Sequence, residues 1–275
     1  MEIDDIRLEE VAHEVHHFTV SFVLPDKSLG QDFVSGSGTL VSAGDKVGIL
    51  TAKHVADLFT GESKQPVALV IAKSPHRFIL QSESFRCIDY LGGLGPTEES
   101  GPDISFLQLL SPESIETIKA RKSVYRLDGK SYSQFPQFES NSFRWFVAGA
   151  LDEFADRKQV AGYPNDILQS TVPSLLTIFE SLESKGTFDI LKLKALAGEL
   201  GYPGDYGGIS GGGVWFSIFR IDPDRGIESL TADPPFLAGV EYCQGDRVDE
   251  AGCRTLICHG PSSIYDYVGK IIAAA

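Results

Sequence analysis

The sequence is poor in the residues that build covalent or metal-bound scaffolds. It contains four cysteines in 275 residues, namely Cys87, Cys243, Cys253 and Cys258, and no two of them form a Cys-x-x-Cys pair. This usage implies neither a dense disulfide framework nor a cysteine zinc site. Cys243 and Cys253 could bridge if they faced each other on a hairpin, but reduced thiols are the favoured interpretation.

Long apolar runs and excess basic charge are also missing. No apolar run reaches the roughly 18 residues that a membrane span needs. The first residues, MEIDDIRLEE, are acidic where a signal peptide is basic, and no apolar segment follows them. We therefore expect no membrane partner and a cytoplasmic location. The net charge of −14 argues against binding to a nucleic-acid backbone, and its simplest interpretation is solubility.

Short segments rich in Val, Ile, Phe and Thr are abundant, and Gly, Pro, Asp or Ser separates most of them. They predict strands over 17–24, 36–43, 46–52, 67–73, 77–91, 104–110, 144–151, 177–182, 188–196, 212–221, 236–243 and 255–260. Apolar spacing and a Ser-Pro-Glu start predict helices over 3–16, 111–121 and 262–275. Many short strands with few helices predict an all-β fold, either a barrel or a sandwich.

Three segments carry residues suited to nucleophilic chemistry: TAKHV (51–55), GPDISFLQL (101–109) and GGISGGGVW (207–215). They supply His54, Asp103 and Ser210. A serine hydroxyl needs a base to take its proton, and the base needs a carboxylate to fix its tautomer. Each residue alone has a simpler interpretation, such as a core histidine, a turn aspartate or a glycine-rich turn. Their combination favours acyl transfer.

At this point the sequence resembles the chymotrypsin/trypsin-like serine peptidase family. GSGTLVS followed by LTAKHV is similar to that family's histidine signature, and GISGG matches its Gly-x-Ser-Gly-Gly motif. FLAGVEY and SSIYDYVGKII resemble its cleft strand and C-terminal helix. The resemblance implies one peptidase domain over 1–275 with a chymotrypsin-like double β-barrel. The barrels would cover about 18–125 and 140–260, followed by the helix 262–275.

The resemblance also implies a role for each matching residue. His54 would be the general base, Asp103 its orienting carboxylate and Ser210 the nucleophile. The amides of Gly208 and Ser210 would form the oxyanion hole. The implied activity is that of a serine endopeptidase acting on protein or peptide substrates through an acyl-enzyme, without a metal or other cofactor. Ile209 departs from the family, whose secreted members carry an activating aspartate there, so we expect no conventional zymogen processing. Control by a regulatory protein partner is then a hypothesis.

The resemblance also points to residues that would line a substrate pocket. Its candidate residues are Gly204, Asp205, Glu241, Tyr242 and His259. Asp205 could meet a basic side chain or serve as a turn residue, and Glu241 could face the cleft or the barrel. Tyr242 falls near a position of the cleft strand that a small serine usually occupies in the family. His259 could favour an acidic or polar substrate side chain, or it could be a core histidine.

Two alternatives remain open. GISGG also fits the nucleophile elbow of an α/β-hydrolase, with Asp233 and His259 as later partners, although the segment after Ser210 is strand-like. The other is a catalytically silent binding module with a peptidase fold.

His13, His16 and His17 cluster near the N-terminus, but no carboxylate spacing supports a metal site, and we interpret them as a solvated face.

Overall fold

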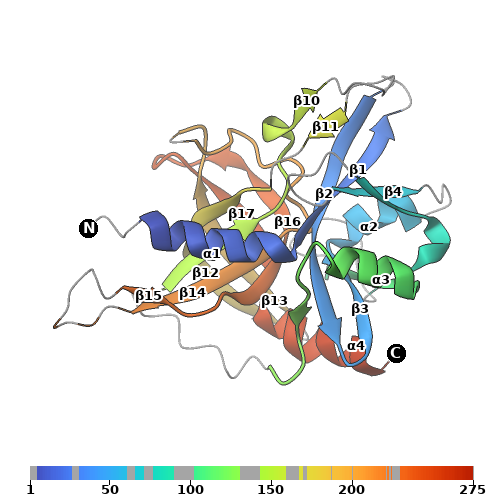
Figure 1. Ribbon diagram of the computed structural model, residues 1–275. Coiled ribbons are helices and arrows are strands. Elements are labelled where there is room, and N and C mark those ends of the chain that lie inside the picture. Colours follow the sequence, from blue (N-terminus) through green and yellow to red (C-terminus); the bar gives the residue numbers. More distant parts are fainter. Residues whose placement is uncertain are drawn as a thin grey trace.

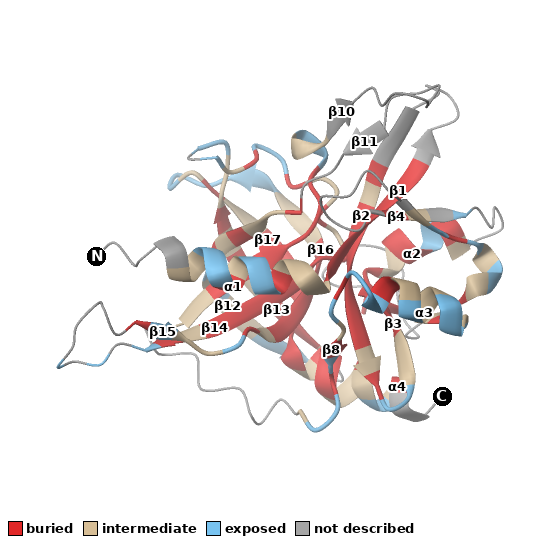
Figure 2. Ribbon diagram, in the orientation of Figure 1, coloured by how far each residue is buried: buried red, intermediate tan, exposed pale blue. Residues whose placement is uncertain are grey.

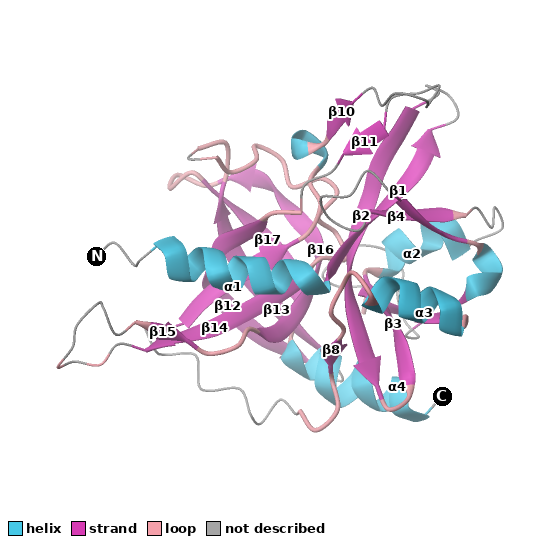
Figure 3. Cartoon of the chain, viewed as in Figure 1, coloured by secondary structure: helices cyan, strands magenta, loops and turns pink. Residues whose placement is uncertain are grey.

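The computed structural model describes most of the chain. The described residues are 5–26, 31–60, 66–70, 77–89, 102–130, 143–158, 167–169, 172–186, 188–199, 201–220, 222, 224 and 230–274. Two large sheets stand beside each other, with short helices around them (Figure 1, Figure 3). Figure 2 shows that burial is concentrated on the strands, whereas α1 and α3 carry exposed residues.

The first sheet comes from the N-terminal half of the chain. Its strands are β1 (Thr19–Asp26), β2 (Gln31–Ala43), β3 (Lys46–Thr51), β4 (Val67–Val70), β5 (Arg77–Leu80), β6 (Phe85–Asp89), β7 (Ser105–Leu109) and β8 (Tyr125–Arg126). They lie in the order β5-β4-β1-β2-β3-β7-β6 with antiparallel pairing, and β8 pairs with β2 in parallel.

The second sheet comes from the C-terminal half. Its strands are β9 (Phe143–Ala148), β12 (Ser174–Lys185), β13 (Phe188–Leu196), β14 (Gly213–Arg220), β15 (Thr231–Ala232), β16 (Phe236–Val248) and β17 (Cys253–His259). They lie in the order β15-β14-β16-β17-β13-β12-β9. Because β9 pairs with both β12 and β14, the antiparallel pairings run around in a ring. A separate pair, β10 (Asp156–Lys158) and β11 (Ile167–Gln169), forms a small antiparallel sheet.

The helices connect and cover these sheets. They are α1 (Asp5–Phe18), α2 (Lys53–Thr60), α3 (Pro112–Lys119), α4 (Gly269–Ala274), the π-helix η5 (Ser263–Val268) and the short 3-10 helices η1 (Ser82–Ser84) and η3 (Asp152–Phe154). The α1 helix ends against the Lys122 ammonium, which donates to the carbonyls of His16 at 2.9 Å and Thr19 at 2.7 Å. This positive group therefore satisfies carbonyls at the helix C-terminus.

The hydrophobic core continues from one sheet to the other. One cluster combines Val11 of α1, Val41 of β2, Trp215 of β14 and Ile264 of η5. Two further clusters fill the interiors of the first and second sheets. Since side chains from both halves share one buried cluster, the two sheets pack against each other. The loops between the sheets therefore lie against packed side chains of both halves.

The sequence predicted the fold class correctly. The described chain is mainly strand in two antiparallel sheets, which confirms the all-β expectation. The helix start at Ser111 is also confirmed, because its hydroxyl accepts from the Ser114 amide at 3.2 Å. The end of the predicted strand 67–73 and the start of the predicted helix 3–16 lie outside the described residues.

Two secondary-structure predictions need correction, and one helix was not predicted. Within the predicted strand 77–91, the described residues 77–89 form two strands, because η1 separates β5 from β6. The helix α2, which the strand-rich pattern around it obscured, begins directly after β3. The predicted helix 262–275 is helical over its described residues 262–274, but its first part is the π-helix η5, where Asp189 accepts from the amide and hydroxyl of Ser263 at 2.8 and 2.6 Å.

Candidate active site

Strand pairing brings His54 and Asp103 together. In the pairing of β3 with β7, Thr51 lies opposite Ser105. His54 follows β3 as the second residue of α2, and Asp103 precedes β7, so both stand at the same end of the two strands. The apolar residues that make these strands buried therefore also position the two polar residues.

The Asp103 carboxyl holds His54 through two hydrogen bonds. One oxygen lies 2.6 Å from Nδ1 of the imidazole, and the other accepts the His54 backbone amide at 2.9 Å. That amide belongs to the first turn of α2, where a carboxylate is favourable. Burial by itself would raise the pKa of Asp103, but the hydrogen bonds from His54 outweigh it and hold the pKa below its usual value. The carboxylate is thus ionised and directs the opposite ring nitrogen, Nε2, away from itself.

Ser210 lies in a turn that glycine makes possible. Gly208 and Gly211 both have φ of +87°, a backbone region that side chains strongly disfavour. A Cβ on Gly211 would stand 2.1 Å from both the Ser37 carbonyl and the Thr51 hydroxyl. The loop therefore approaches the first sheet more closely than any residue with a side chain would permit.

Ser37 of β2 joins the first sheet to this loop, and its role was not predicted from the sequence. Its amide donates to the Ser210 carbonyl at 2.7 Å, and its hydroxyl donates to the Gly208 carbonyl at 2.8 Å. The same hydroxyl accepts the Ala150 amide at 2.7 Å. The Gly-Ser-Gly sequence around it was visible, but the strand pattern alone does not indicate contacts with residues so distant in sequence.

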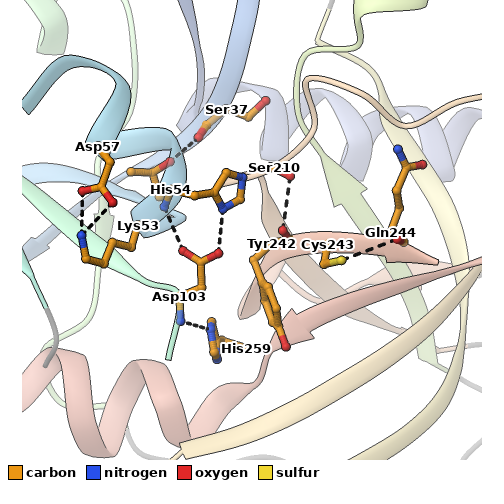
Figure 4. A network of polar contacts seen from close by, with 11 residues as sticks. Ser37, Lys53, His54, Asp57, Asp103, Ser210, Tyr242, Cys243, Gln244 and His259 are labelled. Atoms are coloured by element: carbon orange, nitrogen blue, oxygen red, sulfur yellow. Dashed lines mark hydrogen bonds and ion pairs between the residues drawn. The ribbon is translucent and has the colours of Figure 1, made fainter. Parts of the chain in front are cut away.

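The three predicted catalytic residues meet at the junction of the two halves. Figure 4 shows the His54 ring between the Asp103 carboxylate and Ser210. In this conformation the Ser210 hydroxyl donates to the Tyr242 carbonyl at 3.5 Å, a long contact. Among the hydrogen bonds of the described residues, none joins Ser210 to the imidazole. His54 is partly accessible, with 36% of its side chain exposed, whereas the Asp103 side chain is 3% exposed.

The predicted oxyanion-hole amides are available as donors. Within the described ranges, the amides of Gly208 and Ser210 donate to no other group, whereas their neighbours do: the Ile209 amide donates to Tyr206 and the Gly211 amide to Glu241. The Ile209 side chain is buried in the core of the second sheet. Two unused amides two residues apart in a rigid turn are a suitable arrangement for a developing negative charge.

His259 contacts Asp103, and Tyr242 packs against His259. The ring of His259 is fully buried and accepts the Asp103 backbone amide at its Nε2, at 2.8 Å (Figure 4). The neutral ring must therefore carry its proton on Nδ1. Burial lowers the pKa of His259 to about 4. Its ring stacks on Tyr242 with centroids 4.5 Å apart. In this conformation both residues act as buried support, and contact with a substrate side chain stays a prediction.

Glu241 is the most unusual of the predicted pocket residues. It is completely buried, and neither carboxyl oxygen has a hydrogen-bond partner among the described residues. Burial raises its pKa to about 8; the nearby Ser210 hydroxyl lowers it and the negative charge of Asp103 adds to the increase. Of the two orientations left open by the sequence, the structure places this side chain in the interior.

Gly204 and Asp205 lie in an exposed turn that precedes Ser210 in the chain. The amides of both donate to one carboxyl oxygen of Glu153, at 2.8 and 3.1 Å. Asp205 accepts from the Gln244 side chain at 3.0 Å and from the Gly207 amide at 2.7 Å, and these bonds lower its pKa. Such contacts are typical of a turn residue. A basic substrate side chain at Asp205 stays a prediction.

The described residues also bear on the other expectations. None of the four cysteines forms a disulfide, and Cys243 lies opposite Ile257, not Cys253. The described part of the chain contains no group of three His, Cys, Asp or Glu side chains arranged to hold a metal ion. No described helix is both long and apolar enough to cross a membrane.

The nucleophile-elbow alternative does not fit the geometry. That motif requires a helix after the serine, but β14 follows Ser210 in an antiparallel sheet. Asp233 pairs with the Arg220 guanidinium at 2.7 Å, while His259 binds Asp103. The two residues therefore do not form the acid–histidine pair that this mechanism needs.

Comparisons with known proteins add little. No family model matches the sequence, and no curated protein matches it. A solved structure described as "Aromatic interactions drive the coupled folding and binding of the intrinsically disordered Sesbania mosaic virus VPg protein" is similar over 92% of this chain and 90% of that chain. The sequence identity is 12% and the TM-score is 0.44. At this level the likeness carries no weight for the fold or the activity.

Proposed function

We propose that the protein is a serine endopeptidase of the chymotrypsin-like type, whose two sheets correspond to the two barrels of that fold. The observation that carries the proposal is the bidentate contact of Asp103 with the ring and the amide of His54, next to Ser210 in a glycine turn. This arrangement fixes the imidazole tautomer that a serine nucleophile requires.

The first half of the reaction forms an acyl-enzyme. Ser210 turns its hydroxyl from the Tyr242 carbonyl to His54 Nε2, which takes the proton as Oγ bonds to the substrate's carbonyl carbon. The amides of Gly208 and Ser210 donate to the oxygen that gains negative charge. The carbon–nitrogen bond then breaks, and His54 gives the proton to the leaving amine.

The second half restores the enzyme. A water molecule gives a proton to His54 and bonds to the acyl carbon. The bond to Ser210 breaks, and the serine recovers its proton from the imidazole. Asp103 stays ionised throughout and stabilises the imidazolium. Neither half of the cycle requires a metal ion or a cofactor, and we keep a regulatory protein partner and a cytoplasmic location as parts of the proposal.

Hydrolysis of a diverse peptide pool tests this function. The native protein should create new peptide ends, which mass spectrometry identifies together with the preferred cleavage site. Ser210→Ala should reduce turnover by about 10⁶-fold, and Asp103→Asn by about 10⁴-fold because it allows the wrong tautomer. Cleavage that persists in the folded Ser210→Ala variant would refute the assignment.

The second candidate is a binding module that does no catalysis. It is favoured by one observation, the absence, among the described contacts, of a hydrogen bond between Ser210 and His54. In a peptidase, a Ser210 hydroxyl directed at the Tyr242 carbonyl would be a resting state. Rotation of the serine side chain would then bring the hydroxyl to His54. A peptide that binds with equal affinity to the native and Ser210→Ala proteins, and that neither cleaves, would support the binding module.

A further inference from the structure

Glu241 is buried beside the nucleophile without a compensating charge. Its side chain has no exposed surface, and neither carboxyl oxygen has a partner at hydrogen-bonding geometry among the described residues. Burying an isolated carboxylate costs far more than burying the neutral acid, so such a group keeps its proton. Because neither carboxyl oxygen reaches the surface, a substrate side chain cannot contact the group without rearrangement. Its role is therefore internal.

The backbone fixes Glu241 to the nucleophile loop. Its carbonyl accepts the Gly211 amide at 2.7 Å, and its amide donates to the Gly212 carbonyl at 2.9 Å. These two glycines directly follow Ser210. The Ser210 hydroxyl lies close enough to the Glu241 carboxyl to lower its pKa, and its long contact with the Tyr242 carbonyl leaves it able to turn. The backbone bonds to Gly211 and Gly212 thus place the buried Glu241 beside the turn that carries Ser210.

Three titratable groups near Glu241, namely Asp103, Cys258 and His259, supply no positive charge near neutral pH. Asp103, from the first sheet, is ionised and opposes ionisation of Glu241. Cys258 lies opposite Glu241 on β17, and burial raises the pKa of its thiol well above the usual value, with Cys243 and Glu241 adding to the shift. His259, the next residue of β17, is neutral because burial lowers its pKa to about 4. His54 contacts Asp103 from α2, and Tyr242 stacks on His259.

We propose that the Glu241 carboxyl, in its protonated form, is a positioning residue: once Ser210 turns towards His54, the Glu241 O–H donates to Ser210 Oγ and leaves the serine proton for His54. This inference rests on the proposed function and adds a group to it. A neutral acid is both a donor and an acceptor, whereas a carboxylate is an acceptor alone. Once ionised, Glu241 would accept the Ser210 O–H and withdraw its proton from the imidazole. Reactivity should therefore fall when Glu241 loses its proton.

A fluorophosphonate probe measures this reactivity without knowledge of the substrate. A bond forms between Ser210 Oγ and phosphorus, the phosphorus–fluorine bond breaks, fluoride leaves with the electron pair, and the serine proton passes to His54. The maximal labelling rate and the half-saturating probe concentration are measured against pH for the native protein, Glu241→Gln and Glu241→Met. Glutamine keeps a hydrogen-bond donor and cannot ionise, whereas methionine of similar length offers none.

The native protein should lose reactivity with a midpoint near the Glu241 pKa of about 8, about tenfold for one further pH unit. Glu241→Gln should lack this alkaline decrease. Glu241→Met should label at least about tenfold more slowly than Glu241→Gln at all pH values, with the half-saturating concentration unchanged, because positioning acts on the chemical step. Lys122 and Lys130 also have pKa values lowered to about 8 by burial, but they are present in every variant. The difference between variants therefore belongs to Glu241.

Three results would overturn the inference. An identical alkaline decrease in the native protein and Glu241→Gln would assign it to another group and leave the peptidase proposal intact. A native labelling rate that does not decrease above the midpoint would show that ionisation of Glu241 does not affect Ser210. This result would also leave the peptidase proposal intact. A folded native protein that never labels at Ser210 would overturn this inference and the peptidase function together. If Glu241→Met does not fold, the pH profiles of the other two proteins decide the matter.

Discussion

The substitution Glu241→Gln tests the state of the buried acid through stability alone. In the unfolded chain a glutamate ionises near its usual pKa of 4.5, whereas in the folded protein burial raises the pKa of Glu241 to about 8. Between these values the folded state holds a proton that the unfolded state has released. Stability is therefore greatest below the lower pKa and decreases as pH rises towards the upper one.

The size of the effect follows from the two pKa values. Each unit of difference corresponds to about 1.4 kcal/mol. From about pH 5 to about pH 8 the native protein should therefore lose about 4 kcal/mol of unfolding free energy relative to Glu241→Gln. Since glutamine does not titrate, and all other groups are shared, the difference between the two pH profiles isolates Glu241. Urea unfolding followed by fluorescence at a series of pH values measures it.

The matched control is Glu250→Gln, because the Glu250 side chain is exposed. A change in the pH profile that appears with Glu241→Gln and not with this control is assigned to the buried position. If Glu241→Gln and the native protein instead show parallel profiles over this range, then Glu241 is ionised in the folded protein. Its burial and its unpartnered oxygens would then not keep the carboxyl protonated.

Further predictions concern the support of the site. Burial lowers the pKa of His259 from 6.5 to about 4, so the native protein should lose about 3 kcal/mol as pH falls through this window, and His259→Gln should lose less; urea unfolding checks this. Gly211→Ala should cost about 3 kcal/mol or more, because its Cβ would overlap the first sheet, whereas Gly44→Ala, with φ of +61° and open space, should cost about 1 kcal/mol in thermal unfolding. Ser37→Ala leaves a buried amide and a partly buried carbonyl unpaired and should cost about 2 kcal/mol and slow labelling of Ser210. Ser21→Ala, which removes a buried hydroxyl without a partner among the described residues, should cost less than half as much in the same unfolding assay.

The sequence contained much of the fold because strand patterns are local. Alternation and β-branched residues predicted most of the described strands near their observed positions, and Ser111 marked the start of α3. The helix α2 was missed because KHVADLFT is short and follows a buried strand directly. The break at η1 was missed because SES carries no Gly or Pro to interrupt the strand pattern.

The candidate site also has residues that local motifs predict and contacts that depend on how the two sheets pack. His54, Asp103 and Ser210 stand in recognisable local motifs, so their types and order could be read from the sequence. The contacts of Ser37 could not, because they depend on how the two sheets meet. The orientation of Glu241 also depends on strand register at an irregular pairing between β16 and β17, where a shift of one residue moves a side chain to the other face. The alternatives left open at Glu241 and His259 were therefore inherent in the sequence.

Covalent labelling shows whether Ser210 is a nucleophile activated by His54. The native protein is treated with a fluorophosphonate and digested, and the modified peptide is sequenced by mass spectrometry, beside Ser210→Ala and His54→Ala. We predict a single adduct on Ser210 in the native protein, none in Ser210→Ala, and a strongly slowed reaction in His54→Ala. A folded native protein that stays unmodified, or an adduct on another residue, would contradict the account.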